Sequence, residues 1–171
     1  SGPIGLMTTQ LVRLSGAAEI IATDVVPERV KAAPRFGADI ALDASREDVV
    51  ARIMDHTKGR GVDVVIHATD VEETVDQAMA IAKPAGTVVM VGIPHRDQVS
   101  FRHSPARRKG LTIKFDRRMK HTYPRCMALV QAGRVDVKPI ATHHFPLERL
   151  ADGLEMASHR RGGALKVMID V

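Results

Sequence analysis

The sequence predicts an α/β fold, a doubly wound parallel sheet, from three features. Short runs of apolar, largely β-branched residues recur along the chain, and helical patterns separate them. Runs that are apolar almost throughout are typical of strands covered on both faces, and a helix between consecutive strands supplies the crossover that parallel pairing needs. The predicted strands cover residues 19–24, 38–43, 62–68 and 86–93.

The helical stretches carry start and stop signals. Pro27 is favourable in a first turn and Gly37 closes that helix, while Pro34 removes a backbone donor and predicts an early end or a kink. In the next helix Ser45 is the candidate N-cap and Gly59 the stop.

Later helices are predicted in the same way. Asp70 and Glu73 have the spacing of a capping box at the start of a helix over 70–82. Tyr123 begins a helix that Gly133 ends, and His143 is expected in a loop that leads into the following helix.

The predicted order begins with a helix, whereas a doubly wound sheet begins with the strand that feeds a glycine-rich turn. Gly2 and Gly5 have the spacing of the second and third glycines of G-x-G-x-x-G, whose first glycine would precede Ser1. We therefore expect a strand upstream of Ser1. Either the chain is a piece of a longer protein, or the domain lacks its central strand.

Such a turn, which begins the Rossmann type of doubly wound sheet, is typical of dinucleotide binding, because a pyrophosphate rests on the amides at the helix N-terminus. Asp24 ends the next strand, 19 residues after Gly5, close to the spacing expected of a carboxylate that holds the adenosine ribose. A carboxylate there repels a 2′-phosphate, so NAD is predicted in preference to NADP. The alternative is that Asp24 only caps the helix that begins at Pro27.

The amino-acid composition indicates which general type of protein this is. The 171 residues are 44% hydrophobic and 26% charged, which is ordinary for one globular domain. The single cysteine, Cys126, excludes an intrachain disulfide and a thiolate-cluster zinc site within the chain, and it fits a reducing, cytoplasmic setting. We find no apolar run that could span a bilayer and no start that resembles a signal peptide, so no membrane partner is expected.

The net charge of +5 comes mostly from basic residues between 102 and 120. We interpret them as a solvated face, or a rim that attracts a phosphorylated small molecule, and expect no nucleic-acid partner. Aromatic residues are 3% of the chain and offer few stacking platforms for bases. The histidines, among them His121, His143 and His144, have no accompanying ligand pattern, so no metal site is predicted.

The stretches "GPIGL", "TDVVPERVKAAPRFGAD", "GRGVDVVIHAT", "AGTVVMVGIP", "HTYPRCMALVQAGRVDVKPIATHHFPLERLADGLEMA" and "ALKVMIDV" follow one another along nearly the whole chain. Together they resemble the cofactor-binding half of the medium-chain, zinc-dependent alcohol dehydrogenases. The polyol dehydrogenases, typified by sorbitol and xylitol dehydrogenase, are the most similar branch, and threonine dehydrogenase is a near second. The resemblance implies an NAD-dependent oxidation of a secondary alcohol or polyol to a ketone.

The resemblance also implies a missing part. An N-terminal, barrel-like (GroES-like) catalytic domain would carry the zinc and the catalytic residues, so none of either is expected among residues 1–171. Alone, the chain is expected to bind dinucleotide without turnover.

Site residues are carried over position by position. At the adenosine end, Asp24 would bind the ribose, Arg29 would flank the adenosine, and the pyrophosphate would lie on the backbone of Gly2, Pro3, Ile4 and Gly5. At the nicotinamide end, Arg118 aligns with an arginine near the nicotinamide and substrate. The matching strand ends supply Thr69, Val91, Gly92 and Ile93. Asp70 departs from the glycine usual in the family and puts a charge near the expected cofactor path.

Assembly is implied as well. The edge strand 111–115 is expected to join subunits into a homodimer or homotetramer, and the tail 145–171 to pack toward the missing domain. Two other functions stay open: a stand-alone dinucleotide-binding module without catalysis, and a zinc-independent oxidoreductase of the quinone reductase type. Asp24 and "GPIG" argue against the second of these.

Overall fold

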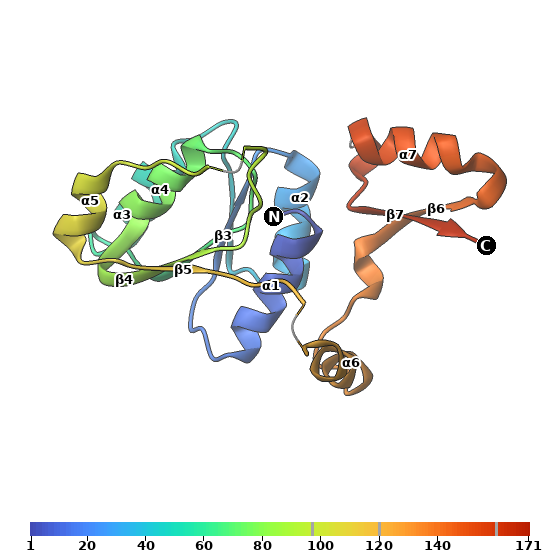
Figure 1. The fold of residues 1–171 in the computed structure, drawn as a ribbon, viewed down its shortest axis with the longest axis horizontal. Helices are drawn as coiled ribbons and strands as arrows, with labels where there is room; N and C mark the ends of the chain where they lie inside the picture. Colours follow the sequence, from blue (N-terminus) through green and yellow to red (C-terminus); the bar gives the residue numbers. More distant parts are fainter. Residues whose placement is uncertain (97, 120, 160) are drawn as a thin grey trace. The chain divides into compact units, whose positions relative to one another are not determined.

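The computed structural model describes residues 1–96, 98–119, 121–159 and 161–171, which form two compact units. One unit combines residues 1–45 with 121–171, and the other is 46–120. The predicted α/β class is confirmed, and the paired strands described in each unit are parallel (Figure 1).

The first unit begins with two helices around a parallel strand pair. Strand β1 pairs with β2 in register from Ile21 and Ile40 to Asp24 and Asp43. The elements are α1 (Pro3–Leu14), β1 (Ile21–Asp24), α2 (Pro27–Ala32), the 3-10 helix η1 (Ala33–Phe36) and β2 (Ile40–Asp43).

The break predicted at Pro34 is confirmed. The α-helix gives way to η1 after Ala32, and Gly37 ends η1 with a φ of 98°. This break lets Ala33 and Phe36 turn inward beside Leu6 of α1, and all three are buried in the core of the unit. Proline thus sets the place where the chain changes from covering the strands to filling the core.

The rest of the first unit holds a second parallel pair, β6 with β7, and α7 lies along it (Figure 1). The elements are α6 (Tyr123–Gln131), η2 (Lys138–Ile140), β6 (Ala141–Pro146), η3 (Leu147–Arg149), α7 (Leu150–His159), η4 (Arg161–Gly163) and β7 (Lys166–Asp170). The loop predicted at His143 is wrong, because that residue lies within β6. Its strand partner comes more than 20 residues later, so local pattern gave no sign of the pairing.

Gly153 explains how closely α7 approaches this pair. A Cβ at Gly153 would lie 2.9 Å from Ile169 Cδ1 and 3.4 Å from Phe145 and Val167. Nearer the start of the unit, Gln10 of α1 exchanges two hydrogen bonds with the backbone of Asp136, at 2.9 and 2.8 Å. This exchange ties the segment after α6 to α1.

The second unit is a three-stranded parallel sheet in the order β3–β4–β5. Its elements are α3 (Val49–His56), β3 (Val62–His67), α4 (Glu73–Ile81), β4 (Ala82–Met90), α5 (His103–Lys109) and β5 (Thr112–Phe115). Strand β4 starts four residues before the predicted position, and β5 confirms the strand expected at 111–115.

Two predicted caps are wrong. Asp48, not Ser45, caps α3, because its carboxylate accepts hydrogen bonds from Val50 N at 2.9 Å and Ala51 N at 3.1 Å. Glu73 is the first residue of α4, which has no side-chain cap, so the capping box with Asp70 does not form.

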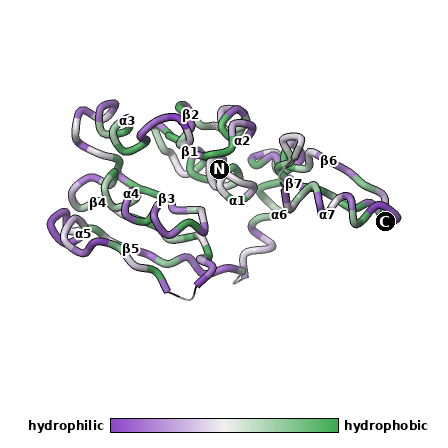
Figure 2. Tube along the Cα trace, turned by 90° about the horizontal axis from the view of Figure 1, so that it is seen from above, coloured by the Kyte–Doolittle hydropathy of each residue, from purple (hydrophilic) through white to green (hydrophobic). Residues whose placement is uncertain are grey.

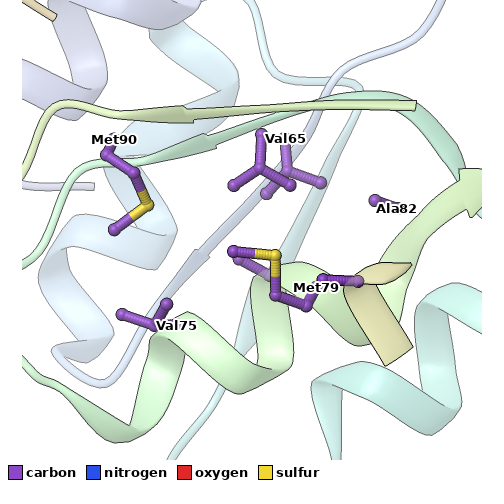
Figure 3. Packing of buried hydrophobic residues seen from close by; sticks show 8 residues of the cluster. Val65, Val75, Met79, Ala82 and Met90 are labelled. Carbon is purple, nitrogen blue, oxygen red and sulfur yellow. The ribbon is translucent and has the colours of Figure 1, made fainter. Parts of the chain in front are cut away.

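The core of the second unit lies between the sheet and α4. Val65 and Met90 from the strands face Val75 and Met79 from the helix (Figure 3). Helix α5 is hydrophilic along most of its length, and only Ala106 of its residues is buried (Figure 2). Of the helices described, none is long and apolar enough to cross a membrane.

Candidate functional site

The glycine-rich turn leads directly into α1. Gly2 is the N-cap in an extended conformation, with no side-chain cap, and Pro3 occupies the first position of the helix. Proline has no N–H, and the Leu6 amide already donates to the Gly2 carbonyl at 2.9 Å. The amides of Ile4 and Gly5 therefore stand at the positive end of the helix dipole, where an anionic oxygen is stabilised.

Asp24 and Arg29 lie beside this turn. Asp24 Oδ2 is 2.5 Å from the Ser1 ammonium and 3.7 Å from Arg29 Nη1, and the two side chains are only 7% and 16% exposed. Arg29 Nη1 lies 3.4 Å from where a Cβ on Gly2 would be. The structure thus brings together the turn, the strand end and the arginine that the sequence indicated separately.

The pKa of Asp24 lies below its usual range. Burial by itself would raise that pKa, but the ammonium that Ser1 carries as the first residue of the given chain, the Val26 amide and the Arg29 guanidinium together lower it by more. In a longer polypeptide Ser1 would carry a peptide amide, and the Val26 amide and the Arg29 guanidinium would remain beside the carboxylate. Asp24 is therefore an ionised carboxylate at neutral pH. A negative charge beside the turn is the requirement for discrimination against a 2′-phosphate.

Part of the alternative role of Asp24 is also present. Its Oδ1 accepts a hydrogen bond of 2.9 Å from the amide of Val26, the N-cap residue of α2. This bond shapes the turn before Pro27 and leaves Oδ2 as the oxygen that faces the glycine turn. Arg29 Nε is buried without a hydrogen-bond partner among the residues described, so one donor there is still unpaired.

Gly5 does not show the close packing expected of the third glycine. No heavy atom in the described part of the chain lies within 4 Å of a Cβ built at Gly5. The side chain of Ile4 is mostly exposed. The third glycine of G-x-G-x-x-G allows close packing of the helix against a strand, and no such contact is seen at Gly5 among the described residues of the first unit.

A second cluster lies in the second unit, after the carboxyl ends of β3 and β4. The segments that follow these strands border a small pocket. Its lining includes His67, Thr69, Asp70, Glu72, Gly92 and Val99. The carboxyl ends of parallel strands are where ligands bind in α/β sheets.

Gly92 and Thr69 are in direct backbone contact there. A Cβ on Gly92 would lie 1.8 Å from the Thr69 carbonyl oxygen, so only glycine fits. The amides of Val91 and Gly92 both donate to the His67 carbonyl at 2.9 Å. Because both amides already donate to the His67 carbonyl, a ligand would meet the carbonyl oxygens at this strand end. The side chain of Ile93 is exposed.

His67 is a buried polar residue in the pocket wall that the sequence analysis did not select. Thr74 Oγ1 donates to the Val71 carbonyl at 2.6 Å, so at 2.7 Å from His67 Nε2 it must accept, and the proton of His67 lies on Nε2. Nδ1 is then an acceptor, buried without a partner among the described residues. Burial lowers the pKa of His67, which favours this neutral form.

The carboxylates of the pocket come from the segment after β3. Asp70 Oδ2 lies 3.0 Å from His95 Nε2 at the surface, and Ser100 Oγ donates to Glu72 Oε1 at 2.5 Å. The sequence analysis did not select Glu72 as a residue of the site. The one signal for it in the sequence is its position two residues after Asp70. Arg118 is exposed after β5 and is not among the residues that line the pocket.

The residues present do not fit a zinc ion. Within residues 1–96, 98–119, 121–159 and 161–171, no three His, Cys, Asp or Glu side chains gather at metal-binding positions.

The sequence of this chain is similar to those of known dehydrogenases. The family model described as zinc-binding dehydrogenase matches residues 3–132. An alcohol dehydrogenase of Cupriavidus necator is 33% identical over 171 residues, covering 98% of this chain and 47% of that protein. The sorbitol dehydrogenase of Ovis aries is 32% identical over 172 residues, covering 99% of this chain and 48% of the enzyme.

Solved structures of dehydrogenases also superpose on this chain. The alcohol dehydrogenase TADH from Thermus sp. ATN1 superposes with a TM-score of 0.89 at 31% identity, covering 99% of this chain and 49% of that one. A protein of Sinorhizobium meliloti 1021, described as a zinc-binding dehydrogenase and solved with NADP bound, gives 0.88 at 30% identity, covering 99% and 50%. The chain therefore spans about half the length of the proteins it matches.

Proposed function

This chain belongs to the zinc-binding dehydrogenase family, and on that premise we propose that it is the NAD-binding half of a dehydrogenase that oxidises a secondary alcohol or polyol to a ketone. The observation that carries the proposal is the ionised, buried Asp24 beside the glycine turn. Relatives that act on alcohols and on sorbitol support the substrate class.

The first unit would hold the adenosine and pyrophosphate. The amides of Ile4 and Gly5 donate to phosphate oxygens, and Gly2 and Pro3 keep the turn free of side chains that would block them. Asp24 accepts hydrogen bonds from the ribose hydroxyls. The guanidinium of Arg29, with its unpaired Nε, flanks the adenosine.

The second unit would hold the nicotinamide. Thr69 and Gly92 form the floor of the pocket, and the carbonyl oxygens near Val91 and Ile93 accept from the carboxamide. NAD, when bound, accepts the hydride that leaves the alcohol carbon. The basic Arg118 would lie near the substrate in the assembled enzyme.

Zinc and the catalytic groups would come from a domain that precedes this chain, a proposal supported by relatives that are about twice as long. The tail 145–171 would pack toward that domain. Three leucines that are exposed on η3 and α7 support this packing: Leu147, Leu150 and Leu154. We further propose a cytoplasmic protein, in line with its free Cys126, that forms a homodimer or homotetramer through β5.

The test is made on the natural polypeptide from its source cells. Its intact mass should be about twice 18.6 kDa, and the purified protein should reduce NAD with a polyol in a reaction that a zinc chelator abolishes. A mass near 18.6 kDa with dinucleotide binding but no turnover would instead support a stand-alone binding module. Turnover of a quinone with NADPH that resists chelation would support the zinc-independent class.

A further inference from the structure

We propose that Asp70 makes the nicotinamide pocket prefer the oxidised cofactor, because its carboxylate stabilises the positive charge of the NAD⁺ ring that NADH lacks. The inference rests on the proposed function, since it requires the pocket after β3 and β4 to receive the nicotinamide.

The position of Asp70 is held by the backbone. It follows Thr69, whose carbonyl is locked against Gly92, and it lines the same pocket. Its side chain is 43% exposed and stands at the pocket opening beside His95. A carboxylate at this place acts on a bound ring without itself having to be buried.

The charges around the pocket have one sign. Asp70 and Glu72 both line it, and no lysine or arginine is found among its described lining residues. The cationic group nearest to Asp70 is the imidazole of His95, which is 87% exposed and carries charge only when protonated. The charged groups among the described lining residues are therefore the two carboxylates, and carboxylates favour a cationic ring.

The ratio of two dissociation constants isolates the effect. Repulsion between Asp70 and the pyrophosphate acts equally on NAD⁺ and NADH, so it cancels in Kd(NADH)/Kd(NAD⁺). The ring charge does not cancel. For one carboxylate and one ring charge in a partly solvated site, Coulomb attraction corresponds to a ratio change of roughly threefold to tenfold.

The experiment compares Asp70→Asn with Asp55→Asn in the intact protein. Asp55 is exposed on α3 and does not line the pocket, so its substitution makes the same charge change elsewhere. Both constants are measured by isothermal titration calorimetry at about pH 8. Asp70→Asn should lower Kd(NADH)/Kd(NAD⁺) roughly threefold to tenfold, Asp70→Gly should do the same, and Asp55→Asn should leave it unchanged.

Two outcomes distinguish a failure of this inference from a failure of the proposed function. If the unmodified protein binds both cofactors and the ratio does not move in either Asp70 variant, or moves equally in Asp55→Asn, the inference is overturned while the proposed function stands. If the unmodified protein binds neither cofactor, the proposed function fails and the inference with it.

Discussion

The α-carbon of Gly92 faces the carbonyl oxygen of Thr69 so closely that a Cβ would lie 1.8 Å from that oxygen. The two residues follow neighbouring strands, β4 and β3, and their backbones meet at the pocket. This contact decides how near the two segments approach each other, and therefore the shape of the floor on which a ligand would rest.

Replacing Gly92 with alanine should destabilise the protein. The added methyl group meets backbone, which cannot rotate away, so the free energy of unfolding should fall by roughly 1–3 kcal/mol in urea unfolding. Gly5→Ala is the matched control, because no described atom lies within 4 Å of its Cβ position. That substitution in a helix should be neutral or stabilising by up to about 1 kcal/mol. Equal losses in both variants would contradict the role of the contact.

Lys109 of α5 holds the end of α4. Its Nζ donates to the carbonyl oxygens of Met79, Ala80 and Ala82 at 3.1, 2.5 and 2.8 Å. Lys109→Met keeps the aliphatic stem but leaves these acceptors without the ammonium, so thermal unfolding should show a loss of about 1–3 kcal/mol. Arg108→Met, which removes an exposed charge from the same helix, should change stability much less.

Asp63 should contribute to acid sensitivity. Hydrogen bonds and charge from Lys83 and Arg60 lower the pKa of Asp63 from 3.8 to about 2. Because the folded-state pKa lies below the unfolded value, the contribution is fully present above about pH 4 and is lost as the pH falls through about 2. Urea unfolding of the wild type and Asp63→Asn should therefore differ at pH 5 and converge near pH 2. A difference that does not change with pH would contradict this assignment.

Asp24 should set the choice between NAD and NADP. Asp24→Asn removes the charge that repels a 2′-phosphate but keeps an oxygen that can accept from the Val26 amide. The ratio Kd(NADP⁺)/Kd(NAD⁺), measured by titration calorimetry on the intact protein, should fall by on the order of tenfold. Asp24→Glu keeps the charge and should keep the preference for NAD⁺. A ratio unaltered by Asp24→Asn would show that the carboxylate only shapes the turn.

The edge strand β5 should join subunits. It pairs with β4 on one side, and Phe115 at its end is 74% exposed. Phe115→Asp places a charge at that edge and should lower the molar mass seen by light scattering to that of a smaller assembly. Met127→Asp changes another exposed apolar side chain, on α6, and should leave the assembly intact. If Phe115→Asp leaves the molar mass unchanged, subunits do not meet through β5.

Much of the fold and part of the site followed from local sequence. Apolar runs predicted β1, β2, β3 and most of β4, and Pro34 predicted the break between α2 and η1, because backbone preference and hydrophobic periodicity act over a few residues. The family resemblance supplied β5. The spacing from Gly5 to Asp24 correctly placed a carboxylate beside the turn. These features depend on residues close together in the chain.

Only the tertiary structure decided the remainder. The pairing of His143 with Val167 in β6 and β7 depends on a partner more than 20 residues away. The burial of His67 against Thr74, and the contact of Gly92 with Thr69, arise when separate segments pack. Hydrogen bonds and close contacts between distant segments are chosen by the whole packed chain, so no local pattern announces them.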